Sequence, residues 1–315
     1  MKGIVFLFDG QGAFRPGVGK ELCSAYLKAQ EIVDKSSKIL GYDIAEYLWG
    51  EKANDTAGQT SIAQPAISTI SLAYAEVLSD LGVQGVTSLG HSLGEATAVI
   101  YCGVVSFSDG IKMIQKRGEV MEAGGKHGTM MAILNIELDT LENICGEVAD
   151  ILSEPVVVAN INAPNQIVIS GSQAGIKKVA QRVAENRGRG IPLNVGGAWH
   201  SPYLQEAADD FARFLDGIEF KKPARDFYSV VNQKILKDPD VIKTSMKDQM
   251  LSQVNWIQAI RNLKSFGYSA FLEIGPSKIL KDLVGKIDPE IMVDSTALHG
   301  ELDKIAEWYS SLRKK

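Results

Sequence analysis

A serine between glycines, in the segment 90–94 (GHSLG), constrains the fold of this chain more than any other feature. Residues 81–89 before it are typical of a turn that leads into a short apolar strand, and residues 95–101 after it are typical of a helix. The glycines let such a tight turn close without Cβ clashes. A serine there projects its hydroxyl out of the sheet at a helix N-terminus, where main-chain N–H groups favour negative charge. The segment therefore predicts a nucleophile elbow with Ser92 as the nucleophile.

Strand-like and helix-like segments alternate along much of the chain. Residues 1–8 are expected to form a buried strand, and residues 17–39 and 65–81 carry helical patterns. Such alternation indicates a parallel sheet covered by helices, which is the architecture of α/β folds. We therefore predict a large α/β domain, hydrolase-like because of its nucleophile elbow, over residues 1–126 and 198–315.

Residues 127–197 show a different pattern. Strands and helices are expected there in the order βαββαβ, at residues 129–134, 138–151, 155–160, 166–171, 173–186 and 191–195. This order is that of the ferredoxin-like or split βαβ motif. A unit of about 70 residues lies within the size range of small domains. We therefore expect an inserted ferredoxin-like subdomain.

The composition excludes several classes of function. The chain has 315 residues and a formal net charge of −5, whereas a nucleic-acid-binding protein is usually basic, so no nucleic-acid partner is expected. The three cysteines are far apart, which fits a reducing compartment and provides neither a metal-ligand pattern nor a disulfide framework. No apolar segment is long enough to cross a membrane or to form a signal peptide. We expect a cytoplasmic protein without a membrane partner.

A serine nucleophile needs a base, and the chain has four histidines, His91, His127, His200 and His299. His299 is expected in a surface turn and His127 in a flexible junction. His91 precedes the serine, so that its side chain diverges from the hydroxyl and can only line the site. His200 stands in the segment 196–202 (GGAWHSP), whose glycines allow close approach of main chain and ligand. An ordinary loop histidine is the alternative, but elimination favours His200 as the base.

Arg117 falls in the middle of the apolar side of a helix expected over residues 111–122. An unpaired buried guanidinium is costly, so this one should meet an anion. One alternative is a structural ion pair with a buried Asp or Glu. The other is a substrate carboxylate bound by both ends of the guanidinium, which would lie close to the reacting carbonyl.

Residues 10–12 (GQG) follow the first strand and resemble a phosphate-binding loop only superficially. The next residues, 13–16 (AFRP), lack the Lys-Ser/Thr pair of such a loop, and no acidic residue stands where a dinucleotide site needs one. An oxyanion hole fits better. The main-chain N–H groups of Gln11 and of Leu93, the residue after the nucleophile, would stabilise the charge of a tetrahedral intermediate.

These segments, taken in order, resemble the malonyl-CoA:acyl carrier protein transacylase family, which includes the enzyme of fatty-acid synthesis and the acyltransferases of polyketide synthases. The resemblance covers nearly the whole chain. It is carried by residues 8–12 (FDGQG), 90–95 (GHSLGE), 116–121 (KRGEVM), 128–133 (GTMMAI), 162–171 (NAPNQIVISG), 200–202 (HSP), 249–256 (QMLSQVNW) and 273–276 (EIGP).

This resemblance implies ping-pong transfer of a malonyl group from malonyl-CoA to the phosphopantetheine thiol of an acyl carrier protein, without a cofactor. Ser92 would carry the malonyl group, His200 would act as base and then as acid, and Arg117 would bind the malonyl carboxylate. The main-chain carbonyl of Gln249 would orient the histidine, although an exposed helix residue is the alternative for that position. The expected partners are a coenzyme A thioester and an acyl carrier protein, and a monomer is expected.

The chain departs from the family pattern at several positions. Asp9 stands where the family usually has proline and adds a charge beside the oxyanion segment. Trp199 precedes the histidine, and a large ring there would crowd an α-methyl group and favour malonyl, unless it only packs at the domain junction. Leu93, in place of the glutamine of branched-extender enzymes, also favours malonyl. With the loosely matching segment 229–232, these departures favour a free-standing acyltransferase of a polyketide pathway over one of fatty acid biosynthesis.

Two other functions stay open. A thioester hydrolase could clear acyl carrier proteins with the same elbow, and a degenerate acyltransferase could serve as a docking scaffold. Arg117 argues for transfer, because it selects carboxylated substrates. Carrier proteins are usually acidic, so a basic docking patch is expected. Its candidates, which a merely solvated helix face would explain equally well, are Lys177, Lys178, Arg182, Arg187 and Arg189.

Overall fold

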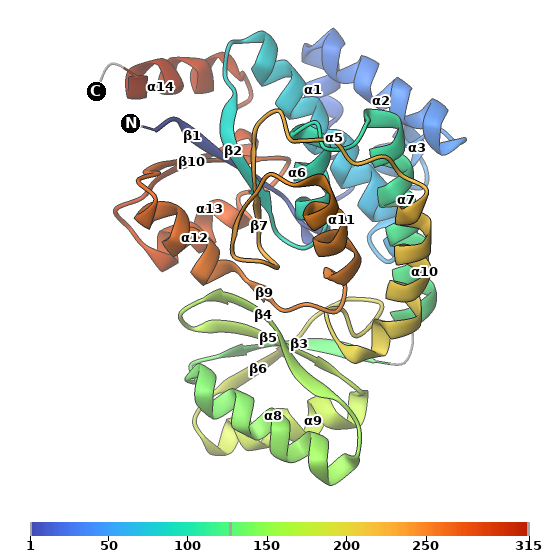
Figure 1. Ribbon diagram of the computed structural model, residues 1–315, viewed down its shortest axis with the longest axis vertical. Helices are drawn as coiled ribbons and strands as arrows, with labels where there is room; N and C mark the ends of the chain where they lie inside the picture. Colours follow the sequence, from blue (N-terminus) through green and yellow to red (C-terminus); the bar gives the residue numbers. More distant parts are fainter. Residues whose placement is uncertain (1, 126–127, 314–315) are drawn as a thin grey trace.

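A mostly parallel sheet forms the centre of the larger part of the molecule (Figure 1). Its strands are β1 (Ile4–Phe8), β2 (Gly85–Gly90), β7 (Asp226–Ser229), β8 (Lys234–Leu236), β10 (Ala270–Ile274) and β11 (Met292–Ser295). The computed structural model describes residues 2–125 and 128–313, and within them the strand order is β11-β10-β1-β2-β7-β8. The pairs are parallel except at the edge, where β8 is antiparallel to β7. The predicted α/β class is confirmed.

Both faces of this sheet are buried. Along β1, Ile4, Phe6 and Phe8 pack into one apolar cluster, and Val5 and Leu7 pack into a second one. Successive side chains of a strand point to opposite faces, so a continuous apolar run marks a strand that is covered on both sides. The helices of this part are α1 (Lys20–Ala25), α2 (Leu27–Leu40), α3 (Ala45–Leu48), α4 (Ala53–Thr56), α5 (Thr60–Asp80), α6 (Leu93–Tyr101), α7 (Phe107–Gly124), α10 (Gln205–Asp216), α11 (Pro239–Asp248), α12 (Trp256–Ser265), α13 (Ile279–Ile287) and α14 (Asp303–Arg313). Among the helices described, none is both long and apolar enough to span a membrane.

Two predicted helices have different boundaries in the structure. The helix expected over 17–39 is divided at Tyr26, whose main chain is extended (φ −130°, ψ 112°). The helix expected over 65–81 begins earlier, at Thr60, so that Pro65 lies inside it. Most residues of α5 are buried. Tertiary packing therefore outweighs the main-chain hydrogen bond that a proline removes.

A second sheet forms the smaller part of the molecule, at the bottom of Figure 1. Its elements are β3 (Thr129–Leu134), α8 (Leu138–Leu152), β4 (Val156–Ala163), β5 (Gln166–Gly171), α9 (Gln173–Glu185), β6 (Arg189–Pro192) and β9 (Val254–Asn255). Over the described residues the strand order is β6-β3-β5-β4-β9. Neighbouring strands from β6 to β4 in this order pair antiparallel, whereas β9 pairs parallel with β4. Helices α8 and α9 bury a third apolar cluster against this sheet.

The last antiparallel strand of the second sheet begins two residues before its predicted position. A strand was expected at 191–195, but the residues that pair with β3 are Arg189–Pro192. Beyond this point the chain leaves the sheet, and Leu193 and Val195 line the cavity described below. Their apolar character, which indicated a strand, is explained by that cavity.

The turn between β2 and α6 depends on two glycines. Ser92 lies in this turn with φ 53° and ψ −106°, a strained conformation for serine. A Cβ at Gly90 would overlap the main chain of Gly94, and a Cβ at Gly94 would overlap the carbonyl oxygen of Phe8. The main-chain N–H of His91 also donates to the Phe8 carbonyl (3.2 Å). The elbow therefore lies directly against the end of β1.

The substitution Gly94→Ala is expected to destabilise the protein by about 3 kcal/mol, because the added methyl group has to displace main chain. Gly146→Ala in α8 is the matched control, since no atom lies within 4 Å of its added Cβ. A helix gains up to ~1 kcal/mol from that exchange. Urea unfolding of the two variants measures both effects. A Gly94→Ala protein as stable as the wild type would contradict the close approach.

Candidate active site

The structure brings Ser92 and His200 into contact. Ser92 precedes α6, and His200 lies in the loop after β6 with a φ of 55°. The serine Oγ is 2.7 Å from the histidine Nε2, and Nδ1 is 2.9 Å from the carbonyl oxygen of Ser252. A carbonyl can only accept, so Nδ1 carries the ring hydrogen and Nε2 is free to accept the serine proton. The pair has the geometry of a nucleophile and its base.

The His200 ring is held in its neutral form. Burial, and to a lesser degree the positive charge of Arg117 and the neighbouring His91 ring, lower the pKa of His200 to about 3. The carbonyl oxygens of Ser252 and Gln249 raise this pKa, but less than the other causes lower it. A base has to be neutral before it can take a proton, and this one is neutral throughout the physiological range.

The carbonyl that orients the histidine differs from the one that the family resemblance implies. That carbonyl was expected at Gln249, but the hydrogen bond from His200 runs to Ser252, three residues further on. The reason is local, because the Gln249 carbonyl accepts the main-chain N–H of Ser252 (3.3 Å) at the end of a helical turn. This turn presents the Ser252 carbonyl to the ring.

The side chain of Gln249 lies inside the site and is only 1% exposed, so the alternative of an exposed helix residue is wrong. Its Nε2 donates to the main-chain carbonyl of Ser92 (2.7 Å), and its Oε1 accepts from Nη2 of Arg117 (2.8 Å). A second contact joins Nε2 to Glu95 at 3.4 Å. One amide therefore links the elbow to the guanidinium.

Arg117 is buried on the apolar side of α7, as its position in the sequence predicts, and is 1% exposed. Its Nη1 donates to Oε1 of Gln64 (2.7 Å), and its Nη2 donates to Gln249 and lies 3.3 Å from the Ser92 Oγ. Over the described residues, the guanidinium forms no ion pair, and its Nε has no partner. Burial lowers its pKa to about 10, opposed by the charge of Glu95. Neutral amides thus orient a cation whose charge no carboxylate contacts.

Two residues of this network were missed from the sequence. Gln64 is a buried polar residue within the apolar run of α5, and that interruption could have indicated it. Glu95 follows the elbow and is 2% exposed, which its place in the first turn of an apolar helix could have suggested. Burial raises the pKa of Glu95 to about 7, against hydrogen bonds from the Ser229 hydroxyl and the Val230 N–H.

A cavity of about 360 Å³ lies over Ser92 and Arg117. Gln11 and Leu93 line it, and each is the first residue of a helix, η1 (Gln11–Ala13) and α6. The first N–H groups of a helix have no partner within that helix. Among the described residues, neither N–H donates to main chain elsewhere. Gly10 lets the two segments approach, since a Cβ there would lie 3.0 Å from the carbonyl oxygen of His91.

His91 lines the cavity from the elbow, as expected, but does not contact the serine as a base. Its Nε2 is 2.7 Å from Oδ1 of Asn162 in β4. Its ring stands edge-on to Trp256, with centroids 5.6 Å apart. Burial lowers its pKa, which leaves the ring neutral. Through Asn162 the second sheet supplies part of the cavity wall.

Trp199 combines the two roles that the sequence left open. Its indole is 7% exposed and lines the cavity beside His200. The same ring packs so closely on Gly125 that a Cβ at this glycine would overlap it. The tryptophan therefore packs at the junction between α7 and the second sheet and also bounds the space over the serine.

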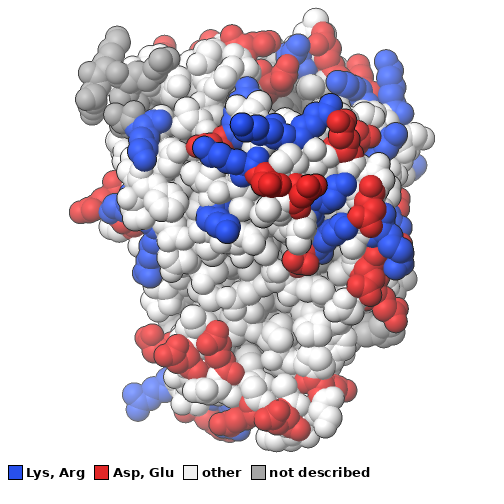
Figure 2. Space-filling view, in the orientation of Figure 1, with Lys and Arg blue, Asp and Glu red and all other residues white. Residues whose placement is uncertain are grey.

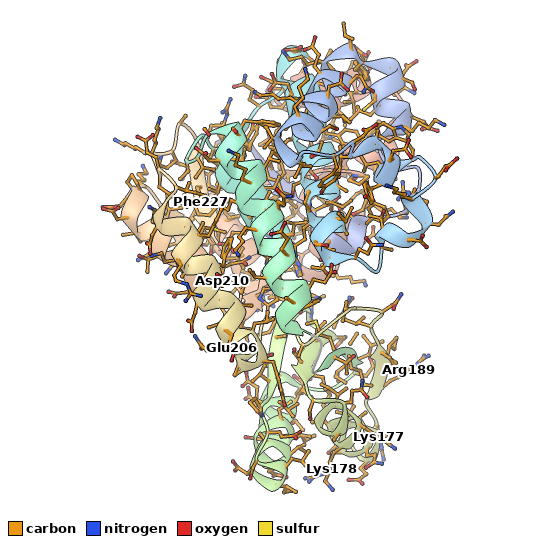
Figure 3. The ribbon with its side chains drawn as sticks, turned by 90° about the vertical axis from the view of Figure 1, so that its right-hand side faces the viewer. Lys177, Lys178, Arg189, Glu206, Asp210 and Phe227 are labelled. Atoms are coloured by element: carbon orange, nitrogen blue, oxygen red, sulfur yellow. The ribbon has the colours of Figure 1, made fainter. Side chains whose placement is uncertain are left out.

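The remaining predicted residues lie away from the cavity. Lys177 and Lys178 on α9 and Arg189 on β6 project from the smaller part of the molecule (Figure 3). Arg182 is paired with Glu147 (2.6 Å) and Glu185 (3.7 Å). Figure 2 shows Lys and Arg mixed with Asp and Glu over the upper part of one face, and few charged side chains across its middle.

His299 has no place in the site. His299 is half-buried and forms a contact of 2.9 Å with Asp294. His127 lies outside the described residues. Among the residues that are described, no group of three or more His, Cys, Asp or Glu side chains is arranged to hold a metal ion.

Comparisons with known proteins agree in their result. The family model of the acyl transferase domain matches residues 5–289. The malonyl CoA-acyl carrier protein transacylase of Bacillus subtilis (strain 168) is 33% identical over 291 residues, with 91% of each chain covered. That of Staphylococcus aureus (strain MW2) is also 33% identical, over 94% of this chain and 96% of the relative.

Similar solved structures are malonyl-transferring enzymes as well. The acyl-carrier-protein S-malonyltransferase of Burkholderia pseudomallei 1710b matches with a TM-score of 0.92 and 29% identity, over 97% of this chain and 99% of the other. A malonyl-transacylase solved in complex with its type II polyketide synthase acyl-carrier protein matches with a TM-score of 0.92 and 27% identity, over the same shares. The chain therefore belongs to the malonyl-CoA:acyl carrier protein transacylase family and is an acyltransferase.

Proposed function

We propose that this acyltransferase moves a malonyl group from malonyl-CoA to the phosphopantetheine thiol of an acyl carrier protein, in polyketide or fatty acid biosynthesis. One observation carries the proposal. The hydroxyl of Ser92 lies within hydrogen-bond distance of both the base His200 and the guanidinium of Arg117, whose charge no carboxylate of the described residues contacts. The names of the relatives, and the relative solved with its acyl-carrier protein, support it.

The geometry suits a two-step, ping-pong reaction. In the first step the Ser92 Oγ attacks the thioester carbonyl while Nε2 of His200 takes its proton. The C–S bond then breaks, and the proton passes to the departing coenzyme A sulfur. In the second step Nε2 takes the proton of the pantetheine thiol, whose sulfur attacks the malonyl-serine ester. The proton finally returns to the Ser92 Oγ. The N–H groups of Gln11 and Leu93 stabilise the oxyanion in both steps.

Arg117 selects the acyl group. Gln64 and Gln249 hold its two terminal nitrogens in place, and at a pKa of about 10 the guanidinium is charged at neutral pH. A carboxylate one carbon beyond the reacting carbonyl can bind this cation while the carbonyl lies at Ser92, and such charge-assisted hydrogen bonds are strong. An acetyl group leaves the cation without an anion. No observation favours the hydrolase or the scaffold over transfer.

The finer description of the fold is also a proposal. We assign residues 1–126 and 198–315 to a hydrolase-like domain and residues 127–197 to a ferredoxin-like subdomain. The elbow after β2 supports the first assignment. For the second, the four antiparallel strands lie in the order last, first, third, second along the chain, with two helices on one face. The three free cysteines fit a reducing compartment such as the cytoplasm.

Malonyl-CoA is expected to form a stable covalent adduct on Ser92, and acetyl-CoA to form little. Intact mass spectrometry after brief incubation with each thioester, followed by peptide mapping, measures the adduct. The Ser92→Ala variant should form none, whereas Ser24→Ala, which changes an exposed serine, should behave as the wild type. Rapid hydrolysis of acetyl thioesters without any malonyl transfer would establish the hydrolase instead.

The variant Arg117→Ala is expected to lose about 100-fold in kcat/KM for malonyl-CoA, since it removes charge-assisted hydrogen bonds worth ~3 kcal/mol in total. The ratio of acetyl to malonyl use should rise accordingly. Lys112→Ala is the matched control, because this exposed lysine lies on the opposite face of α7. Unchanged selectivity in Arg117→Ala would refute the carboxylate-binding role.

The His200 ring is expected to remain neutral as the pH falls to about 5, whereas an unperturbed histidine protonates near pH 6.5. An NMR titration of its ring protons, identified by their loss in His200→Asn, tests this.

The direction in which pH changes the free energy of unfolding follows from the lowered pKa of about 3. Between the two pKa values the unfolded chain binds a proton that the folded protein does not, so this contribution to stability is lost as the pH falls. Protonation near pH 6.5 would contradict the burial of the ring.

A further inference from the structure

Asp9 is a buried carboxyl group that the proposed reaction does not use. It lies between the end of β1 and Gln11 and is 1% exposed. Burying a carboxyl group is costly unless it is neutralised or well hydrogen-bonded. What surrounds Asp9 shows how this cost is met.

The nearest partner of Asp9 is a second buried carboxyl group, Glu273 in the neighbouring strand β10, which is 0% exposed. The hydroxyl of Ser277 lies between the two, 2.9 Å from Oδ1 of Asp9 and 2.7 Å from Oε1 of Glu273. The other oxygens accept main-chain N–H groups, Oδ2 from Ser277 (3.2 Å) and Oε2 from Lys281 (2.7 Å). Within the described part of the chain, neither carboxyl group has an ion pair with Lys or Arg.

Both contacts of the Ser277 hydroxyl can be hydrogen bonds only if this pair of carboxyl groups holds a proton. A serine hydroxyl has one hydrogen and can donate to one carboxyl group only. The other contact is a hydrogen bond only if that carboxyl group is protonated and donates to the serine oxygen. Burial, and then the neighbouring Glu273, hold the pKa of Asp9 well above its usual range.

Other titratable side chains lie around Asp9. Tyr74 faces it from α5, and burial raises the pKa of this phenol to about 12. His91 packs on the adjoining Gly10, and burial lowers its pKa. Two cations also lie in this region, since Arg15 lowers the pKa of Tyr74 by its charge and Arg117 lines the cavity that Asp9 borders.

We propose that Asp9 is a positioning residue for the transfer reaction, which shares one proton with Glu273 and thereby holds the segment of Gln11 beside Ser92. The inference rests on the function proposed above. The shared proton and Ser277 join the end of β1 to the turn after β10. This turn leaves room for the carboxyl group, since a Cβ at Gly275 would overlap Oδ2 of Asp9. Gln11, whose N–H contributes to the oxyanion hole, is only two residues away.

Loss of the shared proton at alkaline pH has a defined consequence. Two negative charges then face each other, and the Ser277 hydroxyl can donate to only one of them. Their repulsion displaces Asp9 and the Gln11 segment. Because an oxyanion contact is made chiefly in the transition state, the effect falls on kcat and not on KM.

The test compares the wild type with Asp9→Asn, whose amide is uncharged at any pH and still donates a hydrogen. The measured rate is that of Ser92 malonylation at saturating malonyl-CoA, by quench and intact mass, which avoids titration of the acceptor thiol. The wild-type rate should fall at alkaline pH, and Asp9→Asn should lack this fall. The rate at high pH divided by the rate at neutral pH should be about tenfold lower in the wild type than in Asp9→Asn. This is part of the ~100-fold or more that one oxyanion donor contributes.

One control variant and one difference in kinetics separate this effect from others. Asp80→Asn, which changes an exposed carboxylate, should keep the wild-type profile. Arg117 also loses its charge near pH 10, but this raises KM for malonyl-CoA in wild type and Asp9→Asn alike. Coincident profiles for these two, or a wild-type rate that stays level until the fold is lost, would overturn the inference alone. Absence of Ser92 malonylation in the wild type would overturn the proposed function and the inference with it.

Discussion

The positive charge of Arg117 is the constraint on which the rest of the site depends. Burying a guanidinium without a carboxylate in contact is unfavourable, and the protein offsets this with amide oxygens from α5 and from the segment after α11. These amides leave the guanidinium beside the Ser92 hydroxyl and open to the cavity. Glu95 lies one hydrogen-bonded step further away, so that it influences the charge without neutralising it. The site is thereby prepared for an anion from outside.

Both parts of the molecule contribute residues around the Arg117 guanidinium. The larger part supplies the elbow, the buried guanidinium and the segment of Gln11. The smaller part supplies Asn162 and the residues that close the far wall of the cavity. Trp199 lies where the parts meet, and its ring packs so closely on Gly125 that no side chain would fit at that position. One side chain thus both lines the cavity and packs against the end of the long helix α7.

Much of this site was predictable because its signals are local. The elbow shows in the spacing of glycines around Ser92, and the burial of Arg117 shows in the helical pattern around it. The contacts that hold Arg117 were not predictable, because Gln249 is separated from it by 132 positions and a glutamine carries no pattern of its own. The orienting carbonyl of Ser252 depends on a single turn of main chain. Strand β9, with its two residues Val254–Asn255, has no periodicity to detect.

Strand β9, although short, connects the segment of Ser252 to the second sheet. It follows Ser252, the residue whose carbonyl orients the base, and pairs with β4 of the second sheet. Between them, the side chain of Gln253 donates to the Val158 carbonyl of the same strand (3.1 Å). The strand that lines the cavity with Asn160 and Asn162 is therefore hydrogen-bonded to the segment whose carbonyl accepts from the His200 ring. A displacement of β4 would therefore reach the Ser252 carbonyl, and with it the orientation of the His200 ring, through this short strand.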